Sequence, residues 1–263
     1  MRSIAIMNQK GGVGKTTTTV NVGAAIAATG AKVLIIDLDP QAHASLHFGL
    51  EMQVDFPSVY DVLVNDAELN EVRQQVGDNL WLIPAHLDLA AADFELSSVF
   101  GREMILRDKL AVDSMTFDYI LVDCPPSLGV LTLNALTAVE EVFIPLQPHF
   151  LALHGLSKLL KTIELVAKRL NNRLEVTGVI LCMFEGSTTL AKEVANDVGS
   201  FFQNEHQHKS PWSRARLFET KIRRNIRLAE APSFGKPIFE YDPHSNGAED
   251  YRNLAKEILF QFK

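Results

Sequence analysis

Cysteine is scarce in this sequence. Cys124 and Cys182 are its two cysteines, and both lie in apolar stretches, which argues against a disulfide framework or a cysteine-based metal site. No apolar run approaches the ~18 residues of a membrane span. The chain enters an apolar run almost at its first residue, which leaves no room for a signal peptide. We therefore expect a cytoplasmic protein and no membrane association.

Neither sign of charge is in large excess. Charged residues make up 22% of the 263 residues and leave a net charge of −7, while hydrophobic residues make up 47%. This composition is ordinary for a soluble globular protein. The acidic balance argues against binding nucleic acid with the whole surface, although a local basic patch is compatible with it. Because there is no internal repeat, low-complexity tract or linker, we expect residues 1–263 to form a single domain.

The most informative stretch is a glycine-rich loop with two lysines. It reads Lys10-Gly11-Gly12-Val13-Gly14-Lys15-Thr16-Thr17. An apolar run at 4–7 precedes it, and apolar residues with helical spacing follow it up to residue 28. Strand, loop and helix in this order are the context of a phosphate-binding loop, whose glycine N–H groups surround a phosphate at a helix start. The general pattern G-x-x-x-x-G-K-[ST] is not met in full, because Gln9 replaces its first glycine. A glycine-rich turn that binds nothing is the alternative.

Two side chains of such a loop have defined chemistry. Lys15 reaches the β- and γ-phosphates of a nucleotide, and the hydroxyl of Thr16 ligates Mg²⁺. The loop therefore predicts a nucleotide bound together with Mg²⁺.

Apolar runs alternate with helical patterns along the chain. We expect strands at 4–7, 33–37, 80–84, 119–123, 142–145 and 178–184, and helices after the loop and at 102–110, 156–170 and 251–262. The strands are apolar on both faces. They therefore predict an α/β fold with a mostly parallel central sheet flanked by helices on both faces. Residues 41–75 are less periodic, and we expect them to hold switch and peripheral helices.

Three aspartates lie at the carboxyl ends of predicted strands. Asp37 and Asp39 leave the strand at 33–37, and Asp123 ends the strand at 119–123. Ligands bind at this end in open α/β sheets. Aspartate is also common in turns, so capping of a strand end is the alternative. Hydrolysis of ATP needs Mg²⁺, charge stabilisation and an oriented water, and a carboxylate placed here suits the last of these tasks.

The second lysine, Lys10, makes the loop resemble the deviant Walker A motif of the ParA/MinD superfamily of dimerising ATPases. The resemblance extends over nearly the whole chain, through D-L-D-P-Q at 37–41, D-C-P-P-S at 123–127 and R-N-I-R-L-A-E-A-P-S at 224–233. Together these motifs resemble the Soj-type ParA partitioning ATPases. The resemblance implies a P-loop NTPase fold, Mg²⁺-dependent hydrolysis of ATP and an ATP-dependent homodimer.

The resemblance also implies roles for the catalytic side chains. Asp39 matches the switch I aspartate that positions the attacking water, and Asp37 lies nearer the Mg²⁺ shell. Asp123 matches the Walker B-like aspartate, which holds a Mg²⁺-bound water. With Lys10 and Lys15, Asp39 and Asp123 form the expected catalytic set.

Two further assignments follow from the same resemblance. Lys10 is expected at the nucleotide of the partner subunit, where it acts like an arginine finger supplied in trans. A solvated lysine beside a loop is the alternative. Asn225 and Pro232 lie where the family places contacts to the adenine base, and either residue is equally compatible with a turn.

A basic segment lies near the C-terminal end. Residues 209–227 contain one acidic residue, Glu219, and seven basic residues: Lys209, Arg214, Arg216, Lys221, Arg223, Arg224 and Arg227. A charge run is often a solvated face. In the Soj-type family this region makes non-specific DNA contacts, which neutralise phosphates and read no bases. We expect these contacts from Lys221, Arg223, Arg224 and Arg227.

The chain departs from the Soj-type pattern at two places. The family's Asp-x-Arg-Thr tetrad is replaced by E-G-S-T at 185–188, so Ser187 stands where an arginine linked to DNA binding is usual. The family's Pro-Arg-Asn is replaced by R-R-N at 223–225, which adds a positive charge. These changes predict a shifted or weakened DNA surface.

Three classes of function are compatible with the loop. The favoured one is a partitioning ATPase that binds DNA non-specifically as an ATP dimer and is released when a ParB-like partner stimulates hydrolysis; its cargo is a chromosome, a plasmid or a protein compartment. A MinD-like membrane-surface ATPase would insert Ile258, Leu259, Phe260 and Phe262 into lipid, but this helix is needed to cover the core. An iron–sulfur reductase would need cysteine ligands, and both cysteines are poorly placed for that.

Overall fold

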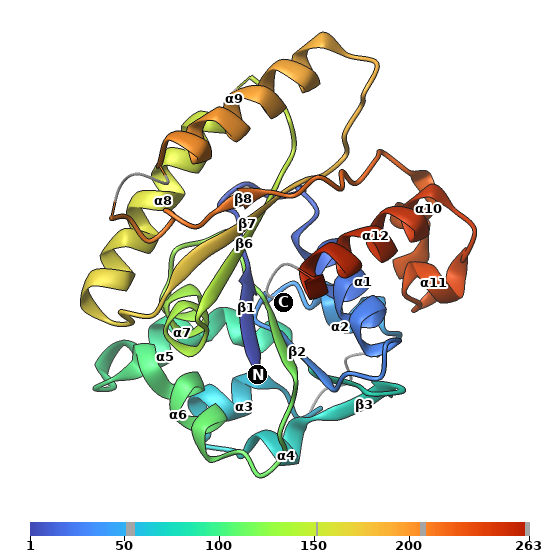
Figure 1. Ribbon diagram of the computed structural model, residues 1–263. Helices are drawn as coiled ribbons and strands as arrows, with labels where there is room; N and C mark the ends of the chain where they lie inside the picture. The colour runs from blue at the N-terminus through green and yellow to red at the C-terminus, as the bar shows by residue number, and fades with distance from the viewer. Residues whose placement is uncertain (51–55, 151, 206–208, 261–263) are drawn as a thin grey trace.

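One twisted sheet runs through the part of the chain that the computed structural model describes, residues 1–50, 56–150, 152–205 and 209–260 (Figure 1). In these residues the sheet has eight strands in the order β3-β4-β2-β5-β1-β6-β7-β8. The strands are β1 (Arg2–Ile6), β2 (Val33–Asp37), β3 (Gln74–Gly77), β4 (Leu80–Ile83), β5 (Tyr119–Asp123), β6 (Glu141–Leu146), β7 (Glu175–Leu181) and β8 (Arg216–Leu217). Neighbouring strands are parallel except β3 and β4, which confirms the predicted α/β class.

Helices cover both faces of this sheet. The α-helices are α1 (Lys15–Ala27), α2 (His43–His47), α3 (Val59–Val64), α4 (Leu69–Val72), α5 (Ala92–Glu95), α6 (Ile105–Val112), α7 (Val130–Ala138), α8 (Ala152–Arg169), α9 (Thr189–Glu205), α10 (Ile226–Glu230), α11 (Ile238–Tyr241) and α12 (Asn246–Phe260). Short 3₁₀ helices lie at η1 (Leu87–Ala91), η2 (Leu96–Ser98), η3 (Arg102–Met104) and η4 (Ala231–Phe234). In Figure 1, α1 and α12 lie together on the side of the sheet away from α7 and α8.

The strands are buried on both faces, as their continuous apolar runs predicted. In β1, Ala5 contributes to the hydrophobic cluster beneath α7 and α8, while Ile4 and Ile6 contribute to the cluster beneath α1 and α12. Successive side chains of a strand point to opposite faces. A strand without polar positions therefore needs a helical layer on each side.

The central position of β1 determines where the functional residues meet. β1 lies between β5 and β6, and the next strand along the chain, β2, lies on the far side of β5. The strands β2 to β5 thus lie on one side of β1, and β6 to β8 lie on the other. This reversal of strand order creates the crevice where open α/β sheets bind ligands. At this edge Asp37 of β2 is in register with Asp123 of β5.

Several elements escaped the sequence analysis or have different ends. β7 ends at Leu181 rather than at residue 184, and α8 begins at Ala152 rather than at residue 156. The short edge strands β3 and β8 carry no apolar alternation that could predict them. Helix α7 is apolar on nearly all sides, so it has no helical periodicity to detect. Helix α9 buries one face, and the helical spacing of its buried residues is a signal by which it could be predicted.

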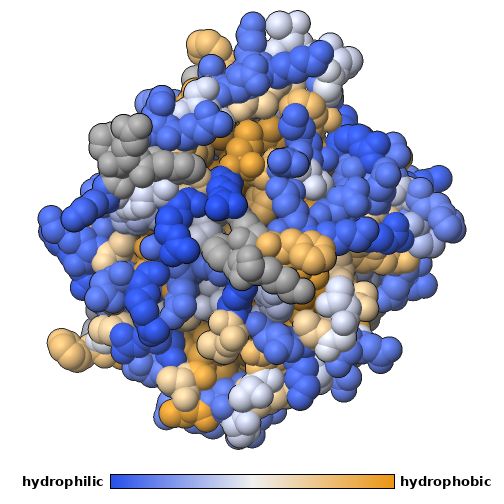
Figure 2. Space-filling model, in the orientation of Figure 1, coloured by the Kyte–Doolittle hydropathy of each residue, from blue (hydrophilic) through white to orange (hydrophobic). Residues whose placement is uncertain are grey.

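The closing helix α12 packs on the core. Ile258 is fully buried, Leu259 is partly buried and Phe260 is exposed, while Phe262 lies outside the described residues. Burial of Ile258 removes a side chain that lipid insertion would need. Hydrophilic residues cover most of the face seen in Figure 2. Among the helices described, none combines the length and the apolar character that crossing a membrane requires.

Candidate active site

The glycine-rich loop leads directly from β1 into α1. Gly12 and Gly14 have φ angles of +70° and +94°, and glycine adopts this left-handed region at little cost. A Cβ atom at Gly11 or Gly12 would meet no other atom within 4 Å, so the backbone there is open to a ligand. Helix α1 starts at Lys15, with no side-chain cap from the described residues and no acidic residue in its first turn. Its free N–H groups and its dipole therefore suit an anion such as phosphate.

Lys15 and Thr16 lie at this helix start, as the motif predicted. The Lys15 ammonium is buried, with 7% of the residue exposed, and donates to the carbonyl of Lys10 at 3.3 Å. Burial lowers the pKa of Lys15, and the nearby Asp123 acts in the opposite direction. The Thr16 hydroxyl donates to Oδ2 of Asp123 at 2.6 Å, and Thr19 donates to Oδ1 at 3.1 Å.

Asp37 and Asp123 form a buried pair of carboxylates. Neither is exposed to solvent. Asp37 accepts from the backbone N–H and the hydroxyl of Ser45 at 2.9 and 2.8 Å. Burial raises the pKa of Asp37 to about 6, and burial together with the charge of Asp37 raises the pKa of Asp123 to about 8. Two neighbouring buried carboxylates cannot both ionise cheaply, so this pair favours a bound proton or a nearby cation.

These oxygens fit a hard cation that is completed by a nucleotide. Among the described residues, no group of three or more histidine, cysteine or acidic side chains could hold a metal alone. Mg²⁺ is usually bound by one or two carboxylates or hydroxyls together with phosphate oxygens and water. Thr16 and Asp123, with Asp37 behind them, supply that kind of partial set next to the phosphate loop.

Asp39 lies just beyond this pair. Its N–H donates to Oδ1 of Asp37 at 3.1 Å, and its own Oδ1 accepts from the N–H of Gln41 at 3.0 Å. Asp39 also lines the large cavity described next. The cavity wall therefore includes the carboxylate of Asp39, whereas Asp37 and Asp123 are not among the described residues that line it.

A cavity of about 1380 Å³ extends from the phosphate loop. Its lining includes Gly11, Gly12, Gly14, Lys15, Thr16, Thr17, Asp39, Asn225 and Pro232. The fold therefore brings residues 225 and 232 to the same cavity as the phosphate loop, although they are far apart in sequence. The Asn225 side chain accepts from the N–H of Arg227 at 2.9 Å and caps α10, so the alternative role in a turn is also satisfied. Val13 is buried in the core.

Lys10 is directed elsewhere. It is not among the described residues that line the cavity, and its Nζ lies 2.7 Å from Nε2 of His149 in the loop after β6. The backbone N–H of Lys10 donates to the side chain of Asn8 at 3.0 Å. Within one chain, the second lysine therefore lies outside the pocket that holds Lys15.

The basic segment is largely paired with acidic or aromatic groups. Arg224 binds Glu185 at 2.6 Å, Arg227 binds Glu230 at 2.8 Å, and Lys221 lies 4.7 Å from the ring centroid of Phe184. Arg223 binds Asp250 and Glu249. These interactions reduce the net positive charge that the segment presents to solvent. The DNA contacts expected from the segment stay a prediction.

Three interactions of the site were not anticipated from the sequence. Ser45 holds Asp37, Thr19 is a second hydroxyl on Asp123, and His149 holds Lys10. Thr19 lies one helical turn after Thr16, which was a usable signal. Ser45 and His149 come from loops and short helices whose approach only the folded chain creates.

Known proteins resemble this chain over most of its length. A family model described as an AAA domain matches residues 1–176. The sporulation initiation inhibitor protein Soj of Bacillus subtilis is 47% identical over 256 residues, which cover 97% of each protein. The chromosome partitioning protein ParA of Caulobacter vibrioides is 42% identical over 262 residues, which cover 98% of this chain and 94% of that protein.

A solved structure agrees with the observed fold. The cobyrinic acid a,c-diamide synthase of Mycobacterium smegmatis, with bound ATP analog and magnesium, superposes with a TM-score of 0.81 at 35% sequence identity, covering 98% of this chain and 94% of that one. The sequence motifs, the parallel sheet and the full-length similarity lead to one conclusion. This chain belongs to the Soj/ParA family of chromosome-partitioning ATPases.

Proposed function

We propose that this protein binds ATP with Mg²⁺ in the cavity beside the phosphate loop and uses its hydrolysis to partition DNA. The observation that carries the proposal is the joint position of Thr16, Asp123 and Asp37 at the start of α1. Their oxygens meet where the loop would present the β- and γ-phosphates of a nucleotide. A cation there would neutralise phosphate charge and replace the proton that the buried carboxylates otherwise need.

Hydrolysis would use separate groups for charge and for water. Lys15 would neutralise charge on the transferred phosphoryl group, and Asp39 would orient the attacking water. Asp123 would hold a water molecule of the Mg²⁺ shell, and its carboxylate would also keep the Thr16 hydroxyl in place through their hydrogen bond. Asn225 and Pro232 would contact the adenine base in the part of the cavity beside α10.

Dimerisation would supply a further positive charge. Lys10 lies outside its own pocket, beside His149, so in a homodimer its ammonium is available to the nucleotide of the partner subunit. A cation supplied in trans acts like an arginine finger. Binding of ATP would then stabilise the dimer, and a ParB-like partner that stimulates hydrolysis would release it.

The dimer would bind DNA without sequence preference and so associate with the nucleoid. Each subunit offers its basic segment, chiefly the exposed Arg224 and the half-buried Lys221. Two such surfaces on one duplex raise the effective concentration of the second contact, so the dimer binds far more tightly than the monomer. The carboxylates beside this segment predict a modest affinity that falls with salt.

The central test is the Lys10→Ala variant in size-exclusion chromatography with and without ATP. We expect the wild type to dimerise with ATP, and the variant to stay monomeric while its nucleotide affinity remains within several-fold of the wild type, because Lys15 is intact. A variant that dimerises normally with ATP would refute the role of Lys10 in trans.

A further inference from the structure

One wall of the cavity is formed by the chain between β8 and α10. We call residues 219–225 the wall segment; its last four residues line the cavity. Backbone hydrogen bonds attach its middle to the end of β7: Ile222 donates to Leu181 at 2.8 Å, and Phe184 donates to Ile222 at 2.9 Å. After Ile222, an isolated parallel bridge pairs Arg223 with Phe184, and Arg224 and Asn225 have no regular secondary structure before α10 begins. Further contacts therefore help to determine where this wall stands.

Helix α12 supplies those contacts through two acidic residues. Asp250 and Glu257 are seven residues apart, two helical turns, and therefore share one face of α12. Glu257 accepts from the backbone N–H groups of Glu219 and Thr220 at 2.7 and 3.0 Å. Asp250 accepts from the backbone N–H of Arg223 at 2.9 Å. The wall segment thus lies along α12, held by backbone hydrogen bonds at Glu219, Thr220 and Arg223.

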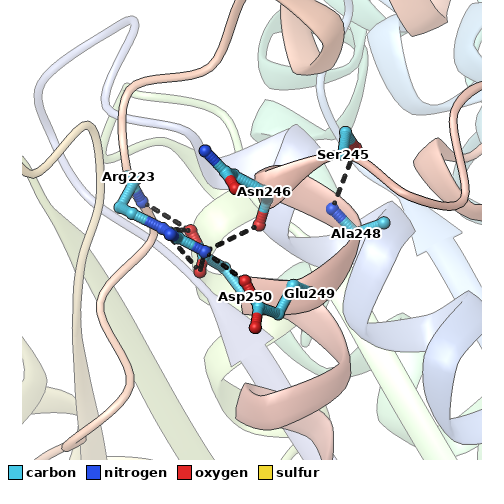
Figure 3. Close-up of polar contacts among 6 residues, drawn as sticks. All are labelled: Arg223, Ser245, Asn246, Ala248, Glu249 and Asp250. Carbon is cyan, nitrogen blue, oxygen red and sulfur yellow. Dashed lines mark hydrogen bonds and ion pairs between the residues drawn. The ribbon is translucent and has the colours of Figure 1, made fainter.

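The side chain of Arg223 closes on the same carboxylate (Figure 3). Its Nε lies 3.0 Å and one terminal nitrogen 2.6 Å from Oδ1 of Asp250, and that terminal nitrogen lies 2.7 Å from Glu249. The Asp250 side chain is only 8% exposed. An arginine–carboxylate fork of this kind is directional as well as strong. Removal of Arg223 would leave Asp250 without its charge partner at a mostly buried position, whereas removal of Asp250 would leave Arg223, which is 43% exposed, paired with Glu249.

The same turn of α12 also reaches the helix of the phosphate loop. Tyr251 follows Asp250, and its hydroxyl lies 3.1 Å from Oγ1 of Thr18 in α1. Both groups are buried. Helix α12 therefore connects the wall segment to the helix that starts at the phosphate loop.

Arg223 occupies the place where the family pattern has proline. Proline stiffens a segment because its ring fixes φ and removes the N–H. In this chain the N–H is present and binds Asp250, and the guanidinium binds it again. The hydrogen-bonded side chains of Arg223 and Asp250 thus restrain the wall segment at the position where a proline ring would restrain it in the family's Pro-Arg-Asn sequence.

We infer that Arg223 and Asp250 are a positioning pair for the nucleotide site. The pair holds the wall segment against α12, and the wall segment holds Asn225 at the cavity. This inference rests on the proposed binding of ATP and assigns Arg223 a role other than a DNA contact. Lys15, Asp39 and Asp123 are held by other elements, so the pair governs nucleotide affinity and not the chemical step.

The test uses the full-length protein with a fluorescent ATP analogue for Kd and steady-state hydrolysis for KM and kcat. Asp250→Asn keeps the shape of the side chain but removes its charge. We expect Kd and KM to rise about tenfold, equivalent to about 1.4 kcal/mol, while kcat stays within twofold. The matched control is Glu249→Gln, which removes the other carboxylate on the same guanidinium. Glu249 is 61% exposed, so we expect a change below twofold.

A second substitution tests coupling. Arg223→Lys keeps the charge but cannot form the planar fork, and it should raise Kd several-fold. The double variant Arg223→Lys with Asp250→Asn should bind no more weakly than Asp250→Asn alone, because the two residues act as one unit. If the wild type binds the analogue and Asp250→Asn binds it within twofold, the positioning role is wrong. A wild type that fails to bind the analogue would instead refute the proposed function.

Discussion

Removal of one buried carboxylate should stabilise this protein while greatly slowing its hydrolysis of ATP. The substitution is Asp123→Asn. Asp123 is fully buried, lies in register with Asp37 and accepts two threonine hydroxyls. Asparagine has the same shape and can still pair with both hydroxyls, but it carries no charge next to Asp37.

The magnitude follows from the pKa of the pair. The usual carboxyl pKa is 3.8, and burial raises that of Asp123 to about 8. The folded protein therefore holds a proton that the unfolded chain has released, so stability falls as pH rises from about 4 to about 8. One pKa unit is 1.36 kcal/mol, so even two units of this shift cost about 2.7 kcal/mol at pH 8. For a chain of this length, that corresponds to a Tm difference of roughly 5–10 °C.

The assay is thermal unfolding of the nucleotide-free protein from pH 5 to pH 8. We expect Asp123→Asn to melt above the wild type at pH 8 and the difference to shrink toward pH 5, where Asp123 is protonated. Saturating ATP with Mg²⁺ should stabilise the wild type by about 2.7 kcal/mol at a hundredfold excess over Kd, and should stabilise the variant less. Hydrolysis should fall about 10²-fold, as when one electrostatic partner of a transition state is removed.

The refuting result is equally specific. An Asp123→Asn protein that melts at or below the wild-type temperature at pH 8 would show that the buried pair carries no charge penalty. A difference that does not depend on pH would assign the effect to packing. The control is Asp113→Asn: this aspartate is also poorly exposed, but it pairs with Arg73 and so the variant should be less stable than the wild type at pH 8.

The other predictions address binding, water activation and DNA. Lys15→Ala should abolish nucleotide binding in a fluorescent-nucleotide titration, because it removes the charge partner of the phosphates; wild-type affinity would exclude the loop as the site. Asp39→Ala should bind ATP and elute as a persistent ATP-dependent dimer but hydrolyse it very slowly, and normal turnover would transfer water positioning to another residue. Arg224→Ala should weaken DNA binding and flatten its logarithmic salt slope by about 0.9 for each phosphate that is no longer neutralised, whereas Ser187→Arg should tighten binding. Filter binding over a salt series on two unrelated duplexes measures both, and unchanged slopes in both variants would place the DNA surface elsewhere.

Local sequence was sufficient for the phosphate loop and for the strands that carry the site. A glycine-rich loop between a buried strand and a helix has few structural solutions, since the glycines permit φ angles that other residues avoid. The strands ending at Asp37 and Asp123 were recognisable because strands buried on both faces must be apolar throughout. The closing helix was predicted to cover the core, and burial of Ile258 confirms that prediction.

Local sequence was insufficient where long-range contacts decide. The pairing of Asp37 with Asp123 depends on strand order, and strand order depends on how helices pack across the sheet. The four basic residues of the predicted DNA surface looked alike in sequence, but the fold gives each a different partner. Arg223 is the clearest case, because Asp250 is 27 residues away and becomes its partner only when α12 lies beside the wall segment.

The sequence by itself therefore predicted the chemistry of this protein: a phosphate loop, a hydroxyl expected to bind Mg²⁺ and the acidic groups around them. Those signals are local, since each depends on the backbone preferences of a few adjacent residues. Only the tertiary structure decided which charged side chains are paired or buried and which can contact a ligand. Coulomb interactions and desolvation depend on distance and burial in space, so it took the folded chain to hold Lys10 beside His149, to bury two carboxylates together and to bind Arg223 to α12.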